Sequence, residues 1–225
     1  MVHAYDRGQI FEHTQHMLAE LTSLPPKIRS KSTTVFDIIG FFYSSIQSVL
    51  EGVPHYQSLP LAARRVIIQR NIETVGTLSS IFVAREINAM ENLAYFTGCS
   101  MIYGNENIIL FKNYASQIEK NGSLVKLMLL VMAFSGNNSI VIPNPRENIP
   151  TILCTNALIH VQNIFVTILW KYLIHLYGHT GAIRWFNSSI KFILNILRWT
   201  AEKYHQQHWD MVDNIVENKA LTLIS

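Results

Sequence analysis

The sequence predicts an all-α protein, a three-layer antiparallel helical sandwich with one short β-hairpin. Two observations lead to this prediction. Apolar residues recur at helical spacing over most of the 225 residues, and the segment from Val75 to Ala84 carries no charge on any face. A helix without a polar side is surrounded by other helices. This favours a central layer over a four-helix bundle, in which each helix keeps a solvent-facing stripe.

Composition supports a thick core and limits the functional classes. Residues are 49% hydrophobic and 15% charged, against roughly 25% charged in an average soluble domain. We expect one domain over residues 1–225, and no membrane span, because no window reaches about 18 uninterrupted apolar residues. A net charge of +3 does not favour direct binding to nucleic acid. Cys99 and Cys154 are too few for a zinc site or a disulfide scaffold.

Helix signals follow one another along the chain. The segment from Thr33 shows an apolar i, i+3, i+4, i+7 pattern that stops at Gly52 and Pro54. Pro60 suits the first turn of the next helix. We expect further helices over residues 2–21, 106–120, 123–136, 151–177 and 181–218, the last two separated by the sequence GHTG. Aromatic and β-branched residues punctuated by glycines predict the hairpin over residues 94–107.

Catalytic and metal-binding motifs are not found in the sequence. It has no phosphate-binding glycine loop, HExxH, CxxC pair or GxSxG elbow. His205 and His208 lie three residues apart and could share a helix face toward a metal, which leaves an all-α metalloenzyme as a weaker alternative. Four acidic residues near apolar segments are more simply partners for arginines: Asp37, Glu51, Glu73 and Glu86. We therefore expect no catalytic residue, no cofactor and no metal.

Four stretches resemble, in sequence and in order, the ligand-binding domain of nuclear receptors. They span residues 49–87, 123–138, 160–178 and 182–199. The first resembles the family signature where helices three, four and five meet, the third resembles helix nine, and the fourth resembles helix ten. The resemblance covers about residues 5–215. It is carried by Tyr56, Leu59, Arg64, Ile67, Ile68 and Gln69 in the first stretch, Gln162 and 171–173 in the third, and Arg184, Phe186, Leu197 and Arg198 in the fourth.

The resemblance implies a nuclear location, a three-layer helical fold with one hairpin, and a lipophilic ligand pocket under that hairpin. The residues that we expect to line this pocket are Phe36, Ile39, Phe42, Tyr43, Leu78, Phe82, Phe96 and Met101.

The resemblance also implies a surface groove for a Leu-rich helix of a coregulator protein. Val49, Leu50 and Ile68 would form its floor, and Glu51, Arg64, Arg65 and Gln69 would lie at its rim. In the family, helix ten supplies a homodimer or heterodimer interface. The corresponding candidates in this sequence are Asn187, Lys191, Leu194, Asn195 and Arg198.

Several positions depart from the family pattern. Glu51 stands where the family usually has a lysine that caps the partner helix, and Arg64 stands where glutamine is usual. Glu73 lies one residue away from the family's conserved glutamate position. The chain stops at NKALTLIS, where the final activation helix would begin, and it contains no zinc-finger module for DNA. DNA binding would therefore require a separate module, and the two-charge clamp on an activator is altered.

The sequence thus predicts a regulator of transcription of the nuclear-receptor type, without catalysis, that binds a small hydrophobic ligand, a coregulator or a dimer partner. The alternative is a ligand-independent helical scaffold or dimerisation partner whose pocket is filled by its own side chains. Phe36, Phe41, Phe42, Phe82 and Met90 are bulky enough to fill it.

Overall fold

The computed structural model describes residues 7–25, 28, 33–135, 155–201, 208 and 210–215. Within these ranges the chain forms helices and no strand, which confirms the all-α class. The elements are α1 (Arg7–Ser23), α3 (Thr33–Glu51), α4 (Pro54–Gln57), α5 (Leu61–Glu86), the short 3₁₀ helix η1 (Ala89–Glu91), α6 (Leu93–Tyr103), α7 (Asn105–Gln117), α8 (Gly122–Ala133) and α9 (Thr155–Ala201). Residues 208 and 210–215 are helical as well.

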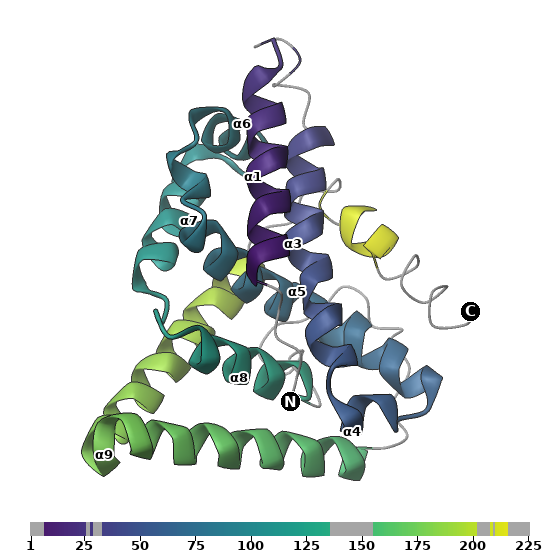
Figure 1. Ribbon diagram of the computed structural model, residues 1–225, viewed down its shortest axis with the longest axis vertical. Coiled ribbons are helices and arrows are strands. Elements are labelled where there is room, and N and C mark those ends of the chain that lie inside the picture. Colours follow the sequence, from purple (N-terminus) through teal and green to yellow (C-terminus); the bar gives the residue numbers. More distant parts are fainter. Residues whose placement is uncertain are drawn as a thin grey trace.

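Helix α5 runs through the middle of the molecule (Figure 1). It packs against α3, α7, α8, α9 and η1, and every residue from Thr74 to Ala84 is buried. The expectation that this uncharged segment is surrounded by other helices is therefore confirmed. Pro60 lies immediately before the helix as its N-cap residue rather than inside the first turn.

Two polar side chains of α5, Asn71 in its interior and Arg85 in its last turn, donate to carbonyls at the ends of neighbouring helices. The last carbonyls of a helix have no partner within that helix. The Asn71 amide donates to the Ala133 carbonyl at the end of α8 at 2.8 Å. The Arg85 guanidinium donates to the Ile118 and Glu119 carbonyls beyond α7, at 2.8 and 2.9 Å. These hydrogen bonds tie α7 and α8 to the central helix.

The hairpin predicted for residues 94–107 is wrong, because this segment forms α6 and the start of α7. The buried residues of α6 include Tyr95, Cys99 and Ile102, which recur at helical rather than alternating spacing. Gly98 is a packing residue and not a turn: a Cβ there would lie 2.5 Å from Cγ2 of Val35. The true break is Gly104, whose φ of 84° separates α6 from α7.

Helix α9 consists of two limbs that meet at Gly178, as the sequence GHTG predicts. Gly178 has φ 66° and ψ 175°, a conformation that is essentially restricted to glycine. Figure 1 shows the first limb (residues 155–177) along one edge of the molecule, below α8, and the second limb (residues 179–201) rising at an angle toward α5. By length and composition alone, the segment from Asn156 to Trp199 would also suffice to cross a membrane.

Candidate functional site

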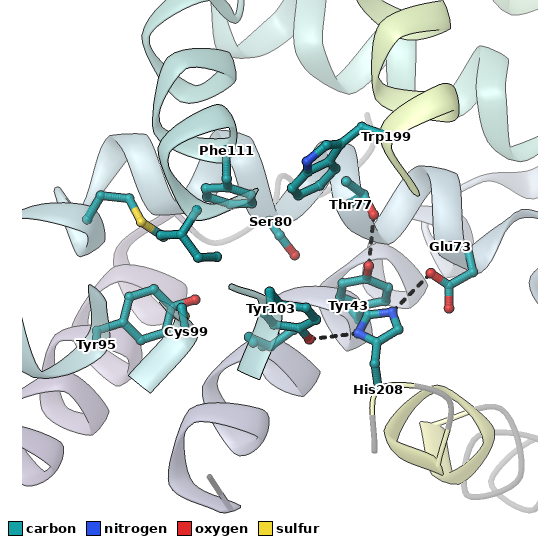
Figure 2. A pocket seen from close by; sticks show the side chains of 13 residues that line it. Tyr43, Glu73, Thr77, Ser80, Tyr95, Cys99, Tyr103, Phe111, Trp199 and His208 are labelled. Carbon is teal, nitrogen blue, oxygen red and sulfur yellow. Dashed lines mark hydrogen bonds and ion pairs between the residues drawn. The ribbon is translucent and has the colours of Figure 1, made fainter. Parts of the chain in front are cut away.

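A cavity of about 60 Å³ lies among α3, α5, α6, α7, the second limb of α9 and His208. We call it the central cavity (Figure 2). Its walls are mainly aromatic and aliphatic, with a few polar groups. The lining residues are Ile39, Tyr43, Glu73, Thr77, Ser80, Met90, Tyr95, Cys99, Tyr103, Ile108, Phe111, Trp199 and His208.

The spacing of three residues on α5 explains the polar part of this wall. Glu73, Thr77 and Ser80 follow one another at intervals of four and three residues, so their side chains lie on one face of the helix. Ile39 and Tyr43 are one turn apart on α3 and face them. Because α5 is otherwise uncharged over this stretch, Glu73 is the last charged residue before its fully buried half.

His208 connects three parts of the chain. Its Nδ1 lies 2.8 Å from the Tyr103 hydroxyl, and its Nε2 lies 3.1 Å from Oε2 of Glu73. A neutral imidazole satisfies this geometry when Tyr103 donates to Nδ1 and Nε2–H donates to the carboxylate. Its ring also meets the ring of Tyr43 edge to face, with centroids 5.5 Å apart. His208 is thereby held against α5 and α6.

Burial raises the pKa of all three tyrosines among the described lining residues of the cavity, and two of them, Tyr43 and Tyr103, belong to its hydrogen-bonded part. Burial raises the pKa of Tyr43 well above its ordinary value, the Glu73 carboxylate raises it further, and the hydrogen bond to Thr77 opposes these effects. That hydrogen bond joins the two hydroxyl oxygens at 2.8 Å. Burial also raises the pKa of Tyr103, with smaller contributions from Cys99 and Glu73. Both phenols therefore keep their protons and act as hydrogen-bonding groups.

Oε1 of Glu73 and Oγ of Ser80, which both belong to residues of the cavity wall, are buried and have no hydrogen-bond partner within the described part of the chain. Buried polar atoms normally have partners, because leaving a buried acceptor unsatisfied costs free energy. These two atoms are the natural contacts for a bound molecule. The Glu73–His208–Tyr103 chain of hydrogen bonds ends in a phenol whose pKa is raised by burial.

Metal binding receives no support from the part of the chain that the structure describes. Within those ranges no group of three or more His, Cys, Asp or Glu residues is placed to hold an ion. His205 lies outside the described residues, so its pairing with His208 stays a prediction. Glu73, which the sequence suggested as a partner for an arginine, contacts His208 instead, whereas Glu86 does pair with Arg85 at 2.7 Å.

The eight residues expected in a ligand pocket are dispersed. Ile39 and Tyr43 line the central cavity, and the other six are not among its lining residues. Their positions differ: Phe42, Leu78 and Phe82 are buried, Phe36 and Phe96 are half-buried, and Met101 is 63% exposed on the outer side of α6. Met101 was assigned to the pocket through the hairpin, and the helical conformation of α6 turns it to solvent.

The residues expected to form a coregulator groove lie close together where α3 meets α5. The proposed floor is covered, since Val49 and Leu50 are each 2% exposed and Ile68 is 8% exposed. At the rim, Glu51 and Arg65 are exposed, and Arg64 and Gln69 are half-buried. The Arg64 guanidinium donates to the Leu59 carbonyl at 3.1 Å, which holds it against the loop before α5.

The five residues expected at a dimer interface are all exposed on the second limb of α9: Asn187, Lys191, Leu194, Asn195 and Arg198. Their spacing of three and four residues puts them on one face of the helix. Large apolar side chains extend this face, as described below.

Sequence reasoning missed most of the polar cavity wall. The spacing of Glu73, Thr77 and Ser80 on one face of an otherwise apolar helix was a usable signal. Tyr103 was hidden by the mistaken hairpin. Its contact with His208 joins residues 105 positions apart, which no local pattern indicates. Comparison with models of protein families, with curated proteins and with solved structures finds no match to this chain.

Proposed function

We propose that the chain is a nuclear-receptor-like regulator of transcription, a non-catalytic domain that acts in the nucleus by binding protein partners and a small ligand. The proposal includes a three-layer arrangement of helices with α5 in the middle layer. It is supported by the order of the helices and by the enclosure of α5. The observation that carries it is the outer surface of α9.

The outer surface of α9 concentrates apolar side chains in contact with solvent. Of the thirteen large hydrophobic residues that are exposed in the described part of the chain, seven belong to this helix. Three of them, Ile183, Ile190 and Leu194, follow one another at intervals of seven and four residues on one face of the second limb, and a contiguous exposed apolar surface supports an interaction site. The seven residues are Ile159, Ile168, Leu176, Tyr177, Ile183, Ile190 and Leu194.

Charge on α9 defines the kind of partner. The helix contains no aspartate or glutamate, and its charged residues are Lys171, Arg184, Lys191 and Arg198. Two copies that meet through this surface bring like charges together, which opposes association, whereas an acidic partner is attracted. Salt screens both effects. A homodimer through α9 is therefore expected to strengthen with added salt, and a complex with an acidic partner to weaken.

Sedimentation velocity of the purified chain at low and high salt tests the interface. We expect a dimer that becomes stronger at high salt, and a monomer for the double variant Leu194→Lys, Arg198→Ala. Leu93→Lys is the matched control, because Leu93 is 78% exposed on α6, away from α9. An unchanged mass for the double variant contradicts the interface. If the wild-type chain is monomeric under all conditions, the homodimer is rejected, and the only remaining possibility for this interface is a different partner chain.

The coregulator groove is a separate part of the proposal and has its own test. Because Val49, Leu50 and Ile68 are buried, a partner helix reaches them only when the side chains above them move aside. A fluorescence titration with a labelled Leu-x-x-Leu-Leu peptide is expected to show tighter binding for Glu51→Lys, because the lysine would cap the peptide's C-terminal carbonyls. Glu106→Lys, an exposed change on α7, is the control. Equal affinities for the two variants contradict the groove.

A ligand-independent scaffold is the second candidate, and the size of the central cavity favours it. The cavity measures about 60 Å³, whereas sites for drug-sized ligands measure roughly 300–1,000 Å³. Mass spectrometry of the gently purified chain separates the two candidates. A retained lipid-sized molecule supports a receptor for lipophilic ligands, and its repeated absence leaves either the scaffold or a much smaller ligand.

A further inference from the structure

The central cavity has a polar end and an apolar end. Figure 2 shows Glu73, His208 and Thr77 on one side, and Tyr95, Cys99 and Phe111 on the other, with Ser80 and Tyr103 between them. A molecule that fills such a cavity has a polar head and a hydrocarbon body.

The charges of the cavity wall define the head. Among the lining residues that the structure describes, Glu73 is the only carboxylate, and none is a lysine or arginine. Oε2 of Glu73 is held by His208 at 3.1 Å, while Oε1 is buried and has no hydrogen-bond partner among the described residues. An anionic head group would therefore meet a carboxylate, with no cation from the described part of the wall to offset it. A cationic head that donates hydrogen bonds would satisfy Oε1 and leave the contact with His208 in place.

The aromatic walls also favour a cation. Tyr43, Tyr103 and Trp199 line the cavity together with Glu73, and the faces of aromatic rings attract ammonium groups. Ser80, which is 4% exposed and whose Oγ has no hydrogen-bond partner, offers a further polar contact on the same helix face.

The cavity volume sets the size of the body. One water needs about 10–15 Å³ on this scale, so about 60 Å³ corresponds to roughly four to six water-sized volumes. We infer that the central cavity is a binding site for a small primary amine. Its ammonium donates to Oε1 of Glu73, and its short hydrocarbon body lies toward Tyr95, Cys99 and Phe111. This inference rests on the proposed function and specifies the class of ligand.

Matched pairs of probes that differ only in their head group test the inference. Isothermal titration calorimetry at neutral pH would compare n-butylamine with pentanoate and n-butanol, and 2-phenylethylamine with 3-phenylpropanoate. We expect saturable one-to-one binding of an amine, at least tenfold weaker binding of the alcohol, and no binding of the acids. Failure of both amines to bind, or equal binding of an amine and its acid, overturns the inference without any variant.

Variants then place the amine at Glu73. Glu73→Gln keeps an acceptor for His208 but removes the charge, and is expected to weaken amine binding at least tenfold. Glu86→Gln is the matched control on the same helix, because Glu86 pairs with Arg85 and does not line the cavity. Melting curves check that both variants are folded. Amine affinity that is unchanged in folded Glu73→Gln overturns the assignment. Dimerisation through α9 is measured independently, so a wild-type chain that dimerises but binds neither amine rejects only this inference.

Discussion

The two longest helices of the protein, α5 with 26 residues and α9 with 47, are both largely apolar, yet they meet opposite environments. From Thr74 to Ala84 each residue of α5 is buried by its own chain. Helix α9 leaves seven large hydrophobic side chains exposed. A largely apolar helix sequence therefore predicts that other protein surface packs against the helix. It does not predict whether that surface belongs to the same chain.

Packing explains the difference. Helices lie on several sides of α5, whereas α9 packs against α8 and α5. Its buried residues in the first limb, Leu158, Val161, Phe165, Leu169 and Leu173, recur every three or four positions and form one inward stripe. Ile159 and Ile168, nine residues apart, lie on the two flanks of this stripe and are 45% and 44% exposed.

Truncating a leucine on each helix is the strongest test of this contrast. Leu78 on α5 is 1% exposed and Leu176 on α9 is 39% exposed. Leu78→Ala is expected to lower the free energy of unfolding by about 2–5 kcal/mol, because it leaves a cavity in the core. Leu176→Ala is expected to change it by less than about 0.5 kcal/mol. Urea unfolding of the two variants measures both values, and similar losses would mean that α9 is as enclosed as α5.

Close packing around α5 gives a second, smaller effect. A Cβ on Gly76 would lie 2.3 Å from Cδ1 of Tyr43, so Gly76→Ala must displace the ring from its contacts with Thr77 and His208. We expect a loss of about 1–3 kcal/mol in unfolding free energy.

Gly40→Ala on α3 is the matched control for Gly76. There the new Cβ would lie 3.5 Å from the Met211 side chain, an ordinary contact. The gain in helix propensity of up to about 1 kcal/mol is expected to keep stability unchanged or raise it. Equal effects of the two substitutions in thermal unfolding would show that α3 and α5 are not packed as tightly as described.

The smallest of the expected effects is a loss of folding stability at alkaline pH. Burial raises the pKa of Tyr56 to about 12, against about 10 in an unfolded chain. Between these values the unfolded state has released the proton that the folded state keeps, so stability is full below about pH 10 and falls up to about pH 12. The buried phenols of Tyr43 and Tyr95, whose pKa values burial also raises, contribute in the same direction.

Tyr56→Phe isolates this contribution. The Tyr56 hydroxyl is buried and has no hydrogen-bond partner, so its removal is expected to leave stability at neutral pH unchanged or up to about 1 kcal/mol higher. In the same variant, the free energy of unfolding, measured with urea, is expected to fall less steeply with pH above about pH 10. The difference in slope corresponds to roughly one proton. An unchanged slope would mean that Tyr56 is hydrated in the folded protein.

Local sequence patterns located several elements closely. The apolar spacing from Thr33 and the stop at Gly52 predict α3, which the structure gives as Thr33–Glu51. The bend predicted within GHTG lies at Gly178. The hairpin failed for a tertiary reason. Gly98 was interpreted as turn punctuation, whereas the structure uses its missing side chain to admit Val35 against α6. The sequence alone does not distinguish a glycine in a turn from a glycine at a close contact between helices.

By itself, the sequence determined that the chain is helical, that part of α5 must be surrounded, and that α9 must bend, because spacing and residue type decide these features locally. Only the tertiary structure decided that Glu73, Tyr103 and His208 meet at one cavity, that the expected groove floor is covered, and which stripe of α9 faces solvent. The contact between His208 and Glu73 spans 135 positions. It depends on how the helices cross, which follows from the shapes of all their packed side chains together and is not encoded in the period of any one helix.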